Sequence, residues 1–350
     1  MSLLAPSAAC TETRKLVGQH HATSSSHNNA LGSGCAAALP IGSFVAIAED
    51  YPSRPITWVV PFPVGGPQDT LARIVTERMS GLLGQPIIIE NVSGAAGSIG
   101  VGRVARAPPD GYTIIQGIWS THVVNGVVYK LSYDVFNDFA PIAHVTDASQ
   151  IVVARKSMPA DDLQDLIAWL RANPDKAWAG TAGAGSPQHI FGLLFQEVTG
   201  TRFGFVHYRG GAPATQDLVG GRVDLIIAAT VTAIPQVRGG TIKAYAVTSK
   251  TRMPAAPDIP TVDEAGLPTF HTSIWTGVWA PKGTSASVIG KINAAIVESL
   301  ADAALRARIE QIGPEVVARE EQTPEALGAL HKAEIAKWWP IIKAAGIKAE

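Results

Sequence analysis

Three short segments combine glycine, hydroxyl and amide residues in a pattern that suits anion binding. They are VGGPQDT (64–70), STHVVN (120–125) and TAGAGSPQH (181–189). The first and third run from an apolar stretch into a helical pattern, and the second follows an apolar stretch. A glycine-containing loop that opens a helix offers backbone N–H groups, and the helix dipole favours a negative charge there. The loops therefore predict recognition of a small anion.

Each loop also has a structural interpretation that the sequence leaves open. The glycines could only form tight turns, and Asp69 or Ser186 could only cap a helix. An ionised Asp69 would repel a bound carboxylate, so we expect it to cap the helix or position water. A ligand with an ammonium group would reverse that preference.

Aromatic and cationic residues near the strand ends are further candidates. Core packing is the expected role of Trp279, whereas Trp119 or Trp275 could wall a cleft and stack on an apolar ligand. Tyr208 and Arg209 stand at a strand end, where Arg209 could clamp an anion or form a surface ion pair.

The sequence lacks the motifs of common catalytic and cofactor sites. It contains no G-x-x-x-x-G-K-[ST], and the run GAGSPQ ends at Gln188 where a dinucleotide fingerprint requires glycine. The nine histidines show no metal-ligand spacing, so we predict no metal and no cofactor. A secreted hydrolase using Ser186 and His189 is the alternative function, but no G-x-S-x-G elbow surrounds that serine.

Composition restricts the partners. The chain has 28 Lys and Arg against 29 Asp and Glu, a net charge of −1, so we expect no nucleic-acid partner. Residues 1–48 are predicted to be a signal or disordered segment, because an apolar run ends in Ala46-Ile47-Ala48, a small-x-small pattern that predicts cleavage after Ala48. A loose tail, or a misassigned start ahead of a genuine signal, is the alternative. The protein is therefore expected to be exported.

From Tyr51 onward, apolar strands alternate with amphipathic helices, which predicts an α/β fold with helices on both faces of its sheets. About nine strands suit two smaller mixed sheets better than one, with seams near 146–150 and 249–270. We therefore expect a two-lobe, venus-flytrap binding protein with a hinge. Lobe one is predicted to comprise 49–150 and 266–350, and lobe two 151–265. The predicted strands are Ile56–Phe62, Pro86–Val92, Thr113–Ile118, Ile151–Arg155, Trp178–Thr181, Phe203–Tyr208, Val223–Ala229, Ile242–Thr248 and Ser273–Ala280.

The order of the motifs resembles one family. The segments YPSRPITWVVPFPVGGPQDTLAR, ENVSGAAGSIG, PDGYT, YDVFNDFAPI, GTAGAGSPQH, HYRGGAPATQDLVGGRVDL, IPTVDEAG and WAPKGT resemble, in order, those of the Bug family. These proteins are periplasmic solute receptors associated with tripartite tricarboxylate transporters. The resemblance covers the chain from Tyr51 to its end.

The resemblance implies a monomeric receptor that binds a small organic carboxylate, either a di- or an aromatic carboxylate, and delivers it to membrane transporter subunits or to a sensor. It implies no enzymatic activity. Ala228 and Ala229 stand where many relatives have an acidic residue, which disfavours an amine-bearing ligand. With the candidates above, the predicted ligand-binding residues are Gly65, Gly66, Gln68, Asp69, Trp119, Ser120, Thr121, Asn125, Thr181, Gly185, Ser186, Gln188, Tyr208 and Arg209.

Overall fold

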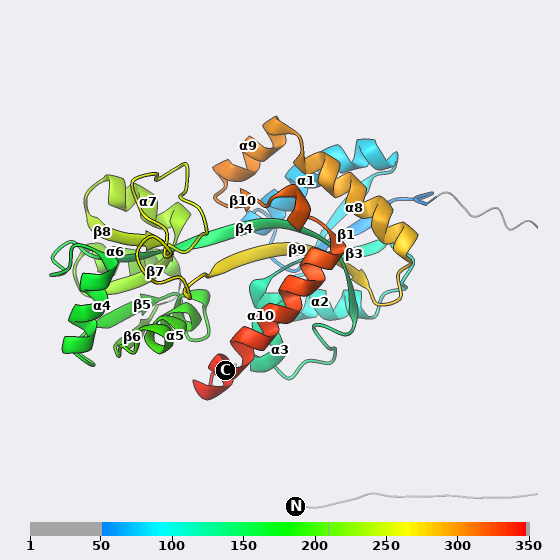
Figure 1. Ribbon diagram of the computed structural model, residues 1–350. Helices are drawn as coiled ribbons and strands as arrows, with labels where there is room; N and C mark the ends of the chain where they lie inside the picture. Colours follow the sequence, from blue (N-terminus) through cyan, green and yellow to red (C-terminus); the bar gives the residue numbers. More distant parts are fainter. Residues whose placement is uncertain (1–50, 209, 348–350) are drawn as a thin grey trace, which may run out of the picture. The chain divides into compact units, whose positions relative to one another are not determined.

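The computed structural model describes residues 51–208 and 210–347 (Figure 1). The predicted signal segment and its cleavage site, together with Arg209, lie outside the described residues. Strands alternate with helices along the chain, as the sequence predicts. The strands are β1 (Ile56–Val60), β2 (Ile87–Asn91), β3 (Thr113–Ile118), β4 (Phe139–Arg155), β5 (Trp178–Thr181), β6 (Gly204–His207), β7 (Leu225–Ala229), β8 (Ile242–Val247), β9 (Ser273–Pro281) and β10 (Glu315–Val316).

The strands form a mixed sheet in the order β2-β1-β3-β9-β4-β7-β5-β6, and β8 and β10 also pair with β4. Strands β1, β2 and β3 are parallel, while β9 runs antiparallel to both β3 and β4. In the second half, β5 is parallel to β6 and β7, and β4 is antiparallel to β7 and β8. The carboxyl ends of each parallel set therefore share an edge.

Strand β4 corrects the predicted organisation. The sequence predicts a strand that begins at Ile151 after a seam at 146–150, but β4 is one 17-residue strand through that seam. Its first part pairs with β9 and β10, and its last part with β7 and β8. Partner strands supply the backbone hydrogen bonds that a polar segment would otherwise take from water. The two expected sheets thus share one strand.

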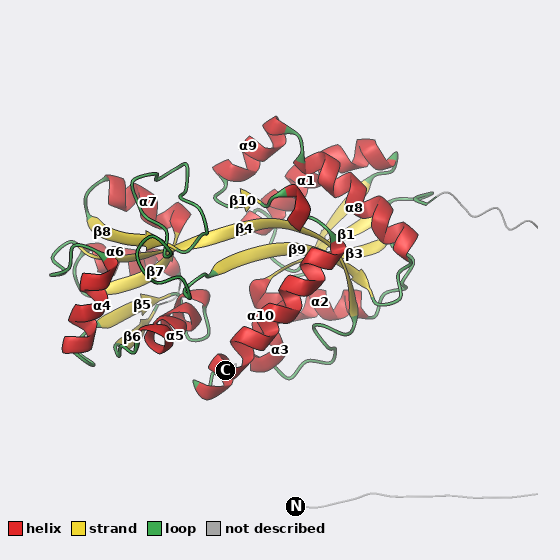
Figure 2. Ribbon diagram, in the orientation of Figure 1, coloured by secondary structure: helices red, strands yellow, loops and turns green. Residues whose placement is uncertain are grey.

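The helices cover both faces of the sheet (Figure 2). Helices α1 (Pro67–Leu83), α8 (Ala286–Leu300) and α9 (Ala303–Gln311) cover one face of the first half of the sheet. Helices α2 (Ser98–Ala105) and α10 (Pro324–Ala344) cover the other. Successive residues of a strand point to opposite faces of the sheet: on β1, Trp58 packs in the core beneath α1, and Val59 packs in the core beneath α2. The helices are α1 (Pro67–Leu83), α2 (Ser98–Ala105), α3 (Asn125–Val128), α4 (Leu163–Ala172), α5 (Pro187–Thr199), α6 (Gly211–Val219), α7 (Thr230–Arg238), α8 (Ala286–Leu300), α9 (Ala303–Gln311) and α10 (Pro324–Ala344).

The segment 249–270 contains no helix and only one isolated bridge residue, Thr261, as its proline content and lack of periodicity predict. Among the helices of residues 51–208 and 210–347, none has the length and apolarity needed to cross a membrane.

Candidate ligand-binding site

The three predicted loops all follow parallel strands at their carboxyl ends. The loop after β1 leads into α1, the segment Ser120–Val124 follows β3 as a single π-helical turn, and the loop after β5 leads into α5. Helices α6 and α7 likewise begin after β6 and β7. Open α/β sheets bind ligands at this edge.

The first loop is held by Asp69, which is almost fully buried. Its carboxylate accepts hydrogen bonds from the Gly65 N–H at 2.8 Å, from Asn91 at 3.1 Å and from Arg73 through two bonds of 3.0 Å. The bonds from Arg73 lower the pKa of this carboxyl group below its ordinary value, so Asp69 is ionised at neutral pH. A residue in the first turn that reaches back to a loop N–H resembles a capping box. Asp69 thus holds the loop through Gly65, while the N-cap residue Gly66 makes no side-chain hydrogen bond.

These bonds correct the expectation of bare N–H groups at the two glycines. The Gly65 N–H donates to Asp69, and the Gly66 N–H donates to the Pro63 carbonyl at 3.3 Å. Pro67 has no N–H, so the first-turn donors without an intrahelical acceptor are those of Gln68 and Asp69. The backbone N–H groups available to a ligand are therefore those of Gln68 and Asp69, and not those of Gly65 and Gly66.

Gln116 positions Gln68, and sequence reasoning did not identify it. Its amide nitrogen donates to the side-chain oxygen of Gln68 at 2.6 Å and to the Gln68 carbonyl at 3.0 Å. The Trp58 indole donates to the Gln116 side-chain oxygen at 3.2 Å. The sequence did contain a signal for Gln116, because it is a glutamine within an apolar strand, and a buried amide needs hydrogen-bond partners.

The second loop turns most of its polar groups inward. Thr121 is fully buried and its hydroxyl bonds to the backbone of Ile118, while the Asn125 amide donates to Ala96 and Ser98. The half-buried Ser120 hydroxyl makes no hydrogen bond to a described residue. Of the three predicted residues of this loop, only Ser120 offers a free side chain.

The structure corrects the prediction that Trp119 or Trp275 lines a cleft, because both rings are buried in the core. Trp119 is fully buried, with its ring 4.9 Å from Phe191 and 5.2 Å from Trp338 between centroids. Trp275 is also buried and its indole donates to Glu334 at 3.3 Å. Both rings pack in the core because three separate elements meet there, which no local pattern reveals.

The third loop is organised around two histidines. Ser186 is the N-cap of α5 and accepts from the His189 N–H at 3.4 Å, while the Gly185 N–H donates to His189 Nδ1 at 3.0 Å. Burial, with a smaller contribution from His207, lowers the pKa of His189 to about 4. The ring is therefore neutral, with its proton on Nε2. Thr181 is buried and shares a 2.7 Å hydrogen bond with His207 Nδ1, a residue that sequence reasoning had not assigned to the site.

This arrangement does not form a hydrolytic pair. His189 Nδ1 is bonded to the Gly185 N–H, and the Ser186 hydroxyl interacts with the backbone of His189 rather than with its ring. A nucleophilic serine requires a hydrogen bond to its base.

The remaining predicted residues lie beside α6. The Tyr208 hydroxyl donates to Asp217 at 2.7 Å, and partial burial together with that bond raises the pKa of Tyr208 to about 12. The Gln188 side-chain oxygen is buried without a partner among the described residues, and its amide nitrogen lies 3.6 Å from where a Cβ on Gly211 would stand.

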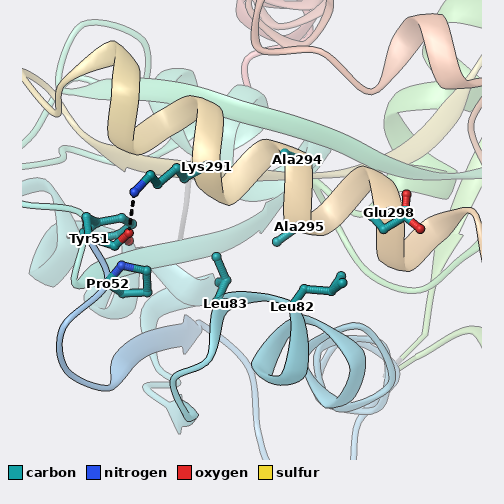
Figure 3. A pocket seen from close by; sticks show the side chains of 8 residues that line it. All are labelled: Tyr51, Pro52, Leu82, Leu83, Lys291, Ala294, Ala295 and Glu298. Carbon is teal, nitrogen blue, oxygen red and sulfur yellow. Dashed lines mark hydrogen bonds between the residues drawn. The ribbon is translucent and has the colours of Figure 1, made fainter.

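A pocket of about 430 Å³ lies away from these loops, between α1 and α8 (Figure 3). Leu82 and Leu83 of α1 face Ala295 of α8 across the pocket, and Lys291 donates to the Tyr51 carbonyl at 2.9 Å. None of its eight lining residues is a predicted site residue. Within residues 51–208 and 210–347, no group of three His, Cys, Asp or Glu side chains could hold a metal ion.

The fold and the loops at the strand ends define the class of two-lobe periplasmic binding proteins. The chain belongs to the tripartite tricarboxylate transporter receptor family, whose pattern matches residues 71–347. It is a solute-binding receptor of that periplasmic family, and not an enzyme.

Relatives extend over nearly the whole chain. A UPF0065 protein of Agrobacterium vitis, from the TAR-I ttuE-ttuC' intergenic region, is 38% identical over 304 residues, covering 87% of this chain and 88% of that protein. The structure of the periplasmic binding protein BugD is 39% identical with a TM-score of 0.66, covering 86% of this chain and all of that one.

Two similar structures contain dicarboxylates. MatC of Rhodopseudomonas palustris, with bound malate, is 38% identical with a TM-score of 0.66, covering 83% of this chain and 100% of its own. Another R. palustris protein, with adipate, is 35% identical with a TM-score of 0.67, covering 85% of this chain and 99% of its own.

Proposed function

We propose that this receptor captures a small organic carboxylate, with aliphatic dicarboxylates as the first class to test, and delivers it to the membrane subunits of a tripartite tricarboxylate-type transporter. The observation that carries the proposal is the similarity, at 35% identity or more, to two receptors with malate and adipate. The chemistry of the loops supports it, because first-turn N–H groups and a free hydroxyl suit carboxylate oxygens. The receptor would act in the periplasm, as a monomer, after cleavage behind Ala48.

The proposed ligand contacts divide between two lobes, residues 49–150 with 266–350 and residues 151–265. On lobe one they are the first-turn N–H groups of α1, the Gln68 side chain and Ser120. On lobe two they are the α5 terminus at Ser186 and Gln188, with the Nε2–H of His189. Contacts to both lobes would stabilise a closed state that the membrane partner recognises.

The hydrogen bonds that Asp69 already makes count against an amine-bearing ligand. Four donor contacts already surround its carboxylate, so it is not available to an ammonium group. The end of β7 at Ala229 brings no acidic side chain either. Carboxylate groups without an amine therefore suit the proposed site best.

A calorimetric titration of the full chain with malate, adipate, citrate, benzoate and glutamate tests the function. We expect saturable binding of a dicarboxylate, with the ligand recovered unchanged. Binding of glutamate alone, or of none of the five, would contradict the proposed ligand class.

Two substitutions test the site itself. Ser186→Asp places a negative charge beside the bound carboxylate, and Gly66→Val adds a side chain whose Cβ would lie 3.3 Å from the Pro63 carbonyl oxygen. We expect each to weaken dicarboxylate binding at least a hundredfold, while circular dichroism shows an intact fold.

Matched controls lie at distant helix positions. Ser287→Asp is exposed in the first turn of α8, and Gly81→Val lies near the far end of α1 with nothing within 4 Å of its Cβ. Both should bind as the parent does. Equal affinity in Ser186→Asp and Ser287→Asp would place the ligand elsewhere.

A further inference from the structure

A separate pocket, with a volume of about 290 Å³, lies between the start of β4, the end of β9 and α10. Its size suits a small ligand, since pockets for drug-sized molecules begin near 300 Å³. Its lining combines three aromatic side chains with one lysine and one histidine. The lining residues are Phe136, Asn137, Phe139, Pro141, Trp279, Lys282, Gly328 and His331.

The strand register separates this pocket from the proposed carboxylate site. Ile118, at the carboxyl end of β3, lies opposite Thr276, whereas Pro281 lies opposite Phe139 at the start of β4. Five residues along β9 correspond to about 16 Å. The end of the pocket at Phe139 and Lys282 therefore lies toward the edge of the sheet opposite the ligand loops, while its Trp279 wall contacts His122 of the second loop.

The pocket's aromatic wall is held rigidly. The Trp279 ring stacks on the buried His122 ring, with centroids 3.9 Å apart and planes inclined by 10°. Phe139 packs against the same imidazole at 5.4 Å. Phe136, in contrast, is 37% exposed, whereas Trp279 and Phe139 are 1% and 6% exposed, so Phe136 is the part of the wall that solvent reaches most. A fixed indole beside exposed phenylalanine suits an aromatic ring.

The inner polar group of the pocket is a neutral imidazole. His331 Nε2 lies 2.6 Å from the His122 carbonyl and donates to it, which leaves Nδ1 as the acceptor. Burial lowers the pKa of His331 to about 4. Behind it, His122 Nε2 is fully buried and has no partner among the described residues. The interior is therefore uncharged at neutral pH.

The charge at this pocket lies on Lys282, which is exposed and whose ammonium group makes no hydrogen bond to a described residue. The two carboxylates of the preceding loop have other partners: Asp134 accepts from the backbone N–H groups of Phe136 and Asn137 and from the Asn137 amide, and Asp138 accepts from the Asp134 N–H. An anionic group at the mouth of the pocket would therefore meet an available cation.

We propose that this pocket is a second ligand site, which binds a small aromatic carboxylate with its ring against Phe136, Phe139 and Trp279 and its carboxylate on Lys282. This proposal does not rest on the proposed dicarboxylate site.

Benzoate is the probe, titrated into the full chain and followed by saturation-transfer difference NMR. Gly328→Leu should weaken benzoate binding at least tenfold, because the Cβ at this position faces Pro141 at 3.4 Å and a larger side chain fills the pocket. Gly290→Leu is the matched control on α8, with nothing within 4 Å of its Cβ, and should bind as the parent does.

Lys282→Gln provides a second test that leaves the packing intact. Loss of a charge-assisted contact at the rim should weaken binding about threefold to tenfold. Lys130→Gln, also exposed, should have no effect. Cyclohexanecarboxylate should bind more weakly than benzoate, because it lacks the aromatic face.

Ser186→Asp distinguishes the two sites, since it should leave benzoate binding at this pocket unchanged while it abolishes dicarboxylate binding. Benzoate binding that survives Gly328→Leu, or that is lost in Ser186→Asp, would overturn the proposal. An absence of benzoate binding at millimolar concentrations would overturn it as well.

Discussion

At the scale of single residues, Asp69 connects the ligand loop to the fold. It has no role in the N-cap position itself, which Gly66 occupies without a side-chain hydrogen bond. Instead its buried carboxylate joins the loop at Gly65, the helix at Arg73 and strand β2 at Asn91. A charge that is buried with several donors stabilises the native state only while it stays ionised.

Asp69→Asn should destabilise the protein by about 2 kcal/mol, the range for hydrogen bonds to a charged group. Urea unfolding at pH 7 measures this. Asp110→Asn, which breaks the exposed pair with Arg54, should cost less than about 1 kcal/mol. Similar losses in the two variants would contradict the assigned role.

The pH dependence of stability should differ between Asp69→Asn and the parent. Because the native pKa of Asp69 lies below its unfolded value, its stabilisation is present above about pH 4 and is lost as the pH falls through the native pKa. As the pH falls from 5 through the native pKa of Asp69, the free energy of unfolding should therefore decrease less in the variant than in the parent. Parallel profiles would argue against a depressed pKa.

At the scale of elements, β3 and the π-helical turn after it depend on each other. The His122 ring folds back onto Trp279 and occupies the space beside Gly117, where a Cβ would stand 2.1 Å from the ring. Only glycine at this strand position allows that stack, and the stack fixes the turn that presents Ser120.

Gly117→Ala should therefore destabilise the protein by about 1–3 kcal/mol, the usual range for overpacking, despite the better strand propensity of alanine. Gly290→Ala on α8 should be neutral or stabilising by up to about 1 kcal/mol. Urea unfolding compares the two. A neutral Gly117→Ala would mean that the imidazole moves aside at no cost.

At the scale of the whole molecule, Trp119, Phe191 and Trp338 join three segments far apart in sequence. The first follows β3, the second lies on α5 and the third on α10, with ring centroids 4.9 to 5.3 Å apart. These contacts, together with continuous strand β4, connect the proposed lobes.

Phe191→Ala should reduce the free energy of unfolding by about 3–5 kcal/mol, because it leaves a cavity between two indoles. Phe136→Ala is the control, since that ring is 37% exposed and should cost about 1 kcal/mol or less. Chemical denaturation of both variants measures the difference. Equal losses would show that the three-ring cluster contributes little.

The sequence determined the alternation of strands and helices, because apolar periodicity reports directly which residues face a core. Eight of the nine predicted strands are present as separate strands, and the ninth, Ile151–Arg155, is the end of β4. The three loops that were selected from glycine and hydroxyl content all lie at parallel strand ends. The cap at Ser186 was also predictable, since it depends on residues only three apart.

Tertiary structure decided what the sequence could not. Whether Gly65 offers its N–H to solvent depends on Asp69, and whether Gln68 is held depends on Gln116 on a strand 48 residues away. The burial of Trp119 depends on α5 and α10. Hydrogen bonds and packing between distant segments have no local signature, because they depend on which strands pair and not on the residues beside them.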